Sequence, residues 1–233
     1  MLRHFGFALA TLTVLSGCAG TGGGFALPKP APKQIRVANN EVLIAGPKGF
    51  CIDPTETRDE GDRAFVLLGS CAAIANVGGK PSPKIPAILT ATVSRKSSST
   101  PIAGSMQTLT DFFASDEGRA ALSRDGKADT IEVIKTLDKN GVFYIHARDS
   151  SSDTLIGAGD EYWRALFDVH GRIISASVFG LKERPFPPNT GFGVLQGFTR
   201  RIRAENATKT AQPTERDKPG IPFLKRLFKR NPV

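Results

Sequence analysis

The chain has 233 residues, of which 40% are hydrophobic and 23% are charged. This balance excludes a wholly disordered polymer and allows one sizeable domain with tails. The formal net charge of +9 favours anionic partners such as nucleic acid, anionic lipid or an acidic protein. In segment 213–233, six Lys and Arg stand against two Asp and Glu, and a basic tail is weaker evidence for nucleic-acid binding than a basic folded surface.

The first 17 residues have the pattern of an export signal. Arg3 supplies a short positive region, and an apolar stretch follows over residues 5–15. This stretch is too short to span a bilayer as a helix, which needs about 20 residues. We therefore predict that segment 1–17 is removed and plays no part in the fold.

The next motif is Leu15-Ser16-Gly17-Cys18, directly after the apolar stretch. It resembles the lipobox of bacterial lipoproteins, in which a signal peptidase cleaves before the cysteine. The resemblance implies that the thiol of Cys18 receives diacylglycerol and anchors the chain to a membrane. The alternative is an ordinary secretory signal that is cut elsewhere, with Cys18 incidental.

The residue after the lipidated position bears on location. In the lipoproteins of enteric bacteria, Asp there favours retention in the inner membrane, whereas this chain has Ala19. The resemblance therefore favours the outer membrane, with the protein facing the periplasm. Export argues against nucleic-acid binding, so we expect no nucleic-acid partner.

Segment 18–33 is rich in Gly and Pro, which predicts a tether between the lipid and the domain. Segment 34–206 is predicted to form a single domain. Segment 207–233 is polar and basic, and we predict a disordered tail with a short amphipathic end. Four cations at that end could contact anionic lipid or an envelope protein, with a frayed tail as the alternative: Lys225, Arg226, Lys229 and Arg230.

Within the domain, β-branched and alternating apolar stretches predict strands over 35–37, 41–44, 49–53, 64–75, 87–94, 130–137, 142–148, 161–169 and 172–178. Residues with helical periodicity predict helices over 105–115, 116–124 and 190–206, with Ser105 and Asp116 as the N-caps of the first two. Two hairpin turns are predicted, at Asn140-Gly141 and at His170-Gly171.

These elements predict an α+β fold in which an antiparallel sheet of about six or seven strands carries helices on one face. The order of the late elements is similar to that of the Mog1/PsbP-like fold. Because one fold hosts many activities, this similarity does not determine a function.

Two cysteines remain inside the domain, Cys51 and Cys71, each in apolar, strand-like surroundings. In an oxidising compartment they are predicted to form a disulfide between neighbouring strands, and two buried free thiols are the alternative. The sequence has no Cys-x-x-Cys motif, and the predicted domain contains only two histidines, His146 and His170. We therefore expect no metal and no cofactor.

No catalytic set stands out. His146 and His170 could act as bases only if the fold brought Asp149 or Asp168 beside them. The exposed helical arginines Arg200, Arg201 and Arg203 are typical of a solvated face, with contact to anionic lipid or cell-wall polymer as the functional alternative. We therefore expect a non-enzymatic accessory or interaction module anchored to the envelope, and the alternative is a periplasmic hydrolase or transferase with a dispersed site.

Overall fold

The computed structural model describes residues 31–76, 79–98, 100–151 and 157–207. The predicted α+β class is confirmed. The main sheet is antiparallel, with strand order β3-β5-β6-β10-β9-β8-β7 and with β4 also paired to β5. These strands are β3 Phe50–Ile52, β4 Arg58–Asp59, β5 Ala64–Ser70, β6 Ala87–Lys96, β7 Ile131–Lys139, β8 Val142–Asp149, β9 Ala158–Val169 and β10 Arg172–Leu181. A separate ribbon pairs β1 Gln34–Val37 with β2 Val42–Ala45.

The hairpin turns in the second half of the sheet form where the sequence predicts them. Asn140 and Gly141 have φ of 56° and 73°, and His170 and Gly171 have φ of 50° and 73°. A tight turn with positive φ at both central residues matches the twist of the flanking strands, and Asn-Gly is its preferred sequence. These turns set the register of β7 with β8 and of β9 with β10, and thus decide which side chains face each side of the sheet.

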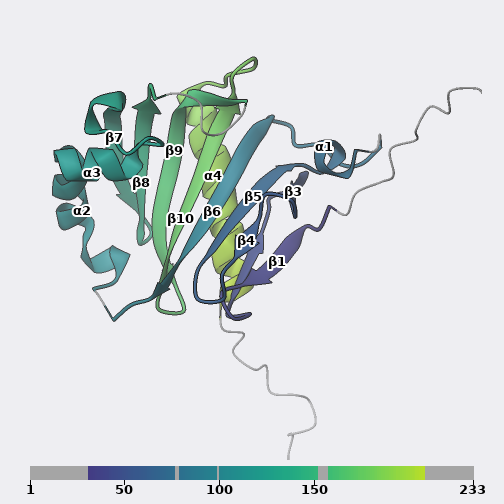
Figure 1. The fold of residues 1–233 in the computed structure, drawn as a ribbon, viewed down its shortest axis with the longest axis horizontal. Coiled ribbons are helices and arrows are strands. Elements are labelled where there is room, and N and C mark those ends of the chain that lie inside the picture. Colours follow the sequence, from purple (N-terminus) through teal and green to yellow (C-terminus); the bar gives the residue numbers. More distant parts are fainter. Residues whose placement is uncertain (1–30, 77–78, 99, 152–156, 208–233) are drawn as a thin grey trace, which may run out of the picture.

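The long helix α4, Pro188–Asn206, covers one face of the sheet and crosses behind β10 and β6 in Figure 1. Its apolar stripe of Leu195, Phe198 and Ile202 is fully buried against side chains such as Val66 and Ile174. Burial of each such side chain contributes about 1.5–3 kcal/mol. The predicted helix over 190–206 is confirmed.

Two further helices, each next to a short 3-10 helix, lie on the opposite face, at the β7 and β8 end of the sheet (Figure 1). They are α2 Met106–Ala114 and α3 Asp116–Leu122, preceded by the short 3-10 helix η1 Ile102–Gly104 and followed by η2 Ala128–Thr130. Phe113 and Leu122 pack there with Phe143 and Ile145. Helices therefore cover both faces of the sheet, α4 on one and α2 with α3 on the other, so the prediction that the helices lie on one face was wrong.

Two local predictions were wrong, and a third was right in position only. The stretch 64–75 is not one strand, because β5 ends at Ser70 and α1, Cys71–Ala75, follows. Three of the five residues of α1 are Ala, the strongest helix former. Ser115 rather than Asp116 caps α3, since its hydroxyl accepts from the Gly118 amide at 3.2 Å. Ser105 stands at the N-cap position of α2, as predicted, but its side chain does not cap the helix, because its hydroxyl donates to the Pro101 carbonyl.

Candidate functional site

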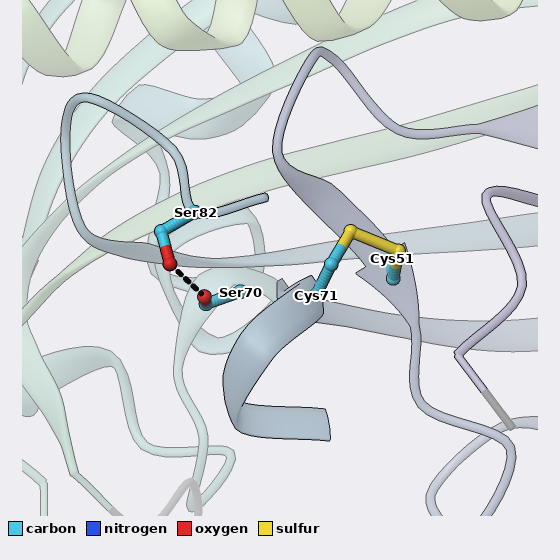
Figure 2. Close-up of a disulfide and its surroundings, with 4 residues drawn as sticks. All are labelled: Cys51, Ser70, Cys71 and Ser82. Carbon is cyan, nitrogen blue, oxygen red and sulfur yellow. Dashed lines mark hydrogen bonds between the residues drawn. A yellow bond between two sulfur atoms is a disulfide. The ribbon is translucent and has the colours of Figure 1, made fainter. Parts of the chain in front are cut away.

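The two domain cysteines form the disulfide that the sequence predicts, and both are buried (Figure 2). Cys51 lies on β3, which pairs with β5, whereas Cys71 is the first residue of α1. The bridge therefore joins a strand to a helix start, and the predicted pairing of two neighbouring strands was wrong in this detail. The Cys71 amide donates to the Gly49 carbonyl at 3.0 Å, which holds the two segments together beside the bridge.

A cleft of about 330 Å³ opens on the α4 side of the sheet, where β9 begins and β10 ends. His146 and Trp163 form its floor, and Phe186 and Pro188 line it from the segment that leads into α4. The Trp163 indole N–H donates to the Pro188 carbonyl at 2.9 Å, so the floor is tied to the start of the helix. Aromatic walls with a few polar groups are typical of small-ligand sites.

His146 is the chemically distinctive residue of this cleft. Its imidazole stacks on Trp163, with ring centroids 4.4 Å apart and planes 5° from parallel. Its Nε2 lies 2.7 Å from Oε1 of Glu161, and only 6% of the residue is exposed. The Glu161 carboxylate also accepts from Arg148 at 3.2 Å. A carboxylate that holds one ring nitrogen orients a histidine for proton transfer at the cleft surface.

The lining also decides which chemistry the His146–Glu161 pair could perform. Among the described residues that line the cleft, none is Ser, Thr or Cys. A covalent mechanism with a Ser, Thr or Cys nucleophile therefore has no support among these residues, and the chemistry open to the pair is the activation of water. The other polar groups at the rim are Asp160 and Lys182.

The histidine partners that the sequence suggested are used elsewhere. Asp149, the last residue of β8, is fully buried, and its Oδ2 accepts from the amide and from Nε of Arg124, at 2.8 and 3.0 Å. Asp168 accepts from the Ile102 amide at 2.7 Å. The sequence analysis missed Glu161 because it lies 15 residues from His146, on the neighbouring strand β9.

The Asp149 carboxyl has a perturbed pKa. Burial raises the pKa of this group, but hydrogen bonds from Ser151 and Arg124 to the carboxylate outweigh burial. The pKa of Asp149 therefore lies below its ordinary value, and the group is ionised in a buried ion pair. Because Arg124 is itself only 10% exposed, this pair fastens the end of α3 to β8.

His170 has a structural role at the β9–β10 turn. Its two ring nitrogens lie 2.9 Å from the carbonyl oxygens of Glu41 and Asn206. The Asn206 side chain in turn accepts from the Leu43 amide at 2.8 Å and donates to the Leu43 carbonyl at 2.7 Å. Together these bonds fix the end of α4 and the β1–β2 ribbon against the main sheet.

Several predicted site residues lie outside the described part of the chain: Cys18, Lys225, Arg226, Lys229 and Arg230. Within residues 31–76, 79–98, 100–151 and 157–207, no group of three His, Cys, Asp or Glu is placed to hold a metal ion. In the same ranges, no helix has the length and apolar character needed to cross a membrane.

Comparison of the chain with protein-family models, with curated protein sequences and with solved structures gives no match. The resemblance of the N-terminal motif to lipoboxes and the similarity to the Mog1/PsbP-like fold therefore stay predictions from the sequence.

Proposed function

We propose that this protein is an envelope lipoprotein, held by lipid on Cys18 to a periplasm-facing membrane surface, preferentially that of the outer membrane. Its folded domain serves there as an accessory or interaction module. The proposal rests on the motif Leu15-Ser16-Gly17-Cys18 after an apolar stretch of export-signal length. Two or three acyl chains on one cysteine give stable anchoring, at about 0.8 kcal/mol per buried CH₂.

The structural observation that carries this proposal is the Cys51–Cys71 disulfide. Disulfides persist in oxidising compartments such as the periplasm and are rare in the cytosol. A bridge buried inside the domain is therefore the feature expected of an exported protein. It also accounts for both domain cysteines and leaves Cys18 as the thiol for acylation.

Intact mass spectrometry of the membrane-extracted protein tests the anchor. We expect the mass to lack residues 1–17 and to carry acyl chains, and we expect two thiols to become alkylatable only after reduction. The matched control is Cys18→Ser, which should keep the disulfide but lose the acyl mass. An unprocessed chain without lipid would refute the proposal.

A second candidate function is favoured by one specific observation, the 2.7 Å contact of His146 with Glu161 inside a cleft. We propose that, if the domain is catalytic, it is a hydrolase in which this pair activates water. The probes are p-nitrophenyl acetate and p-nitrophenyl phosphate. Turnover that is lost in His146→Gln and in Glu161→Gln, but kept in His170→Gln, supports the hydrolase. Absence of turnover, or equal rates in all variants, contradicts it and favours the non-enzymatic module.

A further inference from the structure

Cationic side chains gather on the outer side of α4, on both flanks of its C-terminal half. One surface hollow on the β8 side of the helix is lined by Lys139, Arg200 and Arg203. A second hollow, on the side of β2 and β3, is lined by Lys33, Lys48 and Arg201. Neither hollow has Asp or Glu among its lining residues. We call these six residues the α4 cationic face.

Most of these charges are not neutralised within the protein. Among the described residues, no carboxylate lies in ion-pair distance of Lys33, Lys48, Lys139, Arg200 or Arg203, whereas Arg201 pairs with Glu205 at 2.9 Å. Segment 34–206 as a whole has 21 Lys and Arg and 20 Asp and Glu, which is a net charge of only +1. The cationic face is therefore a local segregation of charge rather than a consequence of a basic domain.

The shape of the helix presents these charges outward. The buried stripe of α4 contains Leu195, Phe198 and Ile202, so the helical period of 3.6 residues places Arg200 on the opposite, outward side. The outward side also holds Gly193 and Gly197, and no atom lies within 4 Å of the position that a Cβ would take at either residue. Small residues on this side let a flat surface approach the arginines closely.

The chain enters the domain beside the second hollow, which Lys33 lines. The Gly46 amide donates to the Lys33 carbonyl at 3.2 Å, and the Ile52 amide donates to the Pro32 carbonyl at 2.7 Å. The end of the predicted tether is thus fixed beside the second hollow. A tether of sixteen residues, 18–33, spans roughly 50 Å at full extension, which keeps the domain within reach of the surface to which it is anchored.

We propose that the α4 cationic face rests on the anionic phospholipid headgroups of the membrane that holds the lipid anchor. The location of that membrane rests on the function proposed above, but the affinity of the face for anionic lipid does not. Exposed Lys and Arg side chains bind phosphate headgroups by summed attraction rather than by a specific pocket. Each cation near an anionic surface increases partitioning about fivefold, which corresponds to about 1 kcal/mol.

Vesicle co-sedimentation tests this proposal with the full chain bearing Cys18→Ser, so that acylation does not contribute. The vesicles contain phosphatidylglycerol and phosphatidylethanolamine, or phosphatidylcholine alone. The test variant replaces Lys48, Lys139 and Arg200 by Ala, because the side chain of none of the three makes an ion pair or a hydrogen bond among the described residues. We expect its binding to phosphatidylglycerol vesicles to fall roughly a hundredfold, with little binding of either protein to phosphatidylcholine.

The control removes the same number of positive charges from another part of the sheet, by Arg58→Ala, Arg63→Ala and Arg95→Ala, and the carboxylates that lose a partner, Glu60 and Asp62, are exposed to solvent. These residues surround a hollow that also contains Phe65 and Ile173, whose strand neighbours Val66 and Ile174 face α4. The control should bind as the parent protein does, and both variants should unfold at the temperature of the parent. Equal loss in the two variants, no loss in the test variant, or binding that disappears only when 208–233 is deleted would overturn the proposal.

Failure of this proposal and failure of the lipid anchor give different results. Acylated protein from membranes together with unchanged vesicle binding by the test variant would leave the anchor intact and reject the orientation. Protein without acyl chains whose vesicle binding depends on Lys48, Lys139 and Arg200 would reject the anchor and leave the cationic face as an independent membrane contact.

Discussion

The Cys51–Cys71 disulfide gives the most direct prediction of a change in stability. The two residues are separated by 20 positions, and the bridge closes that loop in the unfolded chain as well as in the folded one. In the chain-entropy description, a closed loop of about 20 residues lowers the entropy of the unfolded chain enough to contribute about 3 kcal/mol to folding. Reduction of the bridge should lower the free energy of unfolding by about this amount, with small changes in the folded domain.

Urea unfolding of the chain, followed by tryptophan fluorescence, measures this loss. Trp163 is the only tryptophan and is buried against His146, so its emission reports on the domain core. The midpoint should move to lower urea on reduction, and the double variant Cys51→Ala/Cys71→Ala should behave like the reduced protein and be insensitive to reductant. A loss below about 1 kcal/mol on reduction would refute the reasoning, because it would mean that the loop is already restricted in the unfolded chain.

Two further changes probe buried contacts. Asp149→Asn should lower the free energy of unfolding by about 3 kcal/mol at neutral pH, since it leaves the buried Arg124 with only the exposed Asp160, at 3.8 Å, as a counter-charge. Because the folded pKa of Asp149 is lowered, its contribution is complete above its unfolded pKa of about 3.9 and is lost as the pH falls through the folded pKa. The gap between wild type and variant in urea titrations should therefore close below about pH 4, and a gap that widens there would contradict the ion pair. Gly118→Ala should lower the thermal midpoint or prevent folding, because a Cβ at that position would lie 1.9 Å from the Phe112 carbonyl oxygen. Gly193→Ala, where nothing lies within 4 Å, should instead stabilise α4 by about 0.5–1 kcal/mol, and equal effects of the two changes would contradict this packing.

Those features of the fold that depend on neighbouring residues could be predicted from the sequence. The apolar spacing of α4 indicates its buried side, and Asn140-Gly141 and His170-Gly171 indicate their turns, because φ preference and side-chain periodicity are properties of a few consecutive residues. The α+β class follows from the order of such elements. Where local preferences compete, as at α1, the prediction failed: the apolar run after β5 fits a buried strand and a short helix equally well.

The candidate site could not be predicted, because its residues come together only through strand register and long-range packing. His146 contacts Glu161 since β8 pairs with β9 in one register, and a shift by one residue would turn Glu161 to the other face. Asp149 pairs with Arg124 rather than with a histidine because α3 packs beside the end of β8.

The sequence by itself determined the predictions of an export signal and of a lipidated Cys18, and the two cysteines available for a disulfide, since each is read from adjacent residues or from composition. Only the tertiary structure decided that Lys33, Lys48 and Lys139, far apart in the chain, gather around the arginines of α4. The physical reason is that charge acts through distance in space, and the distance between residues of different elements is set by how the sheet and its covering layer pack.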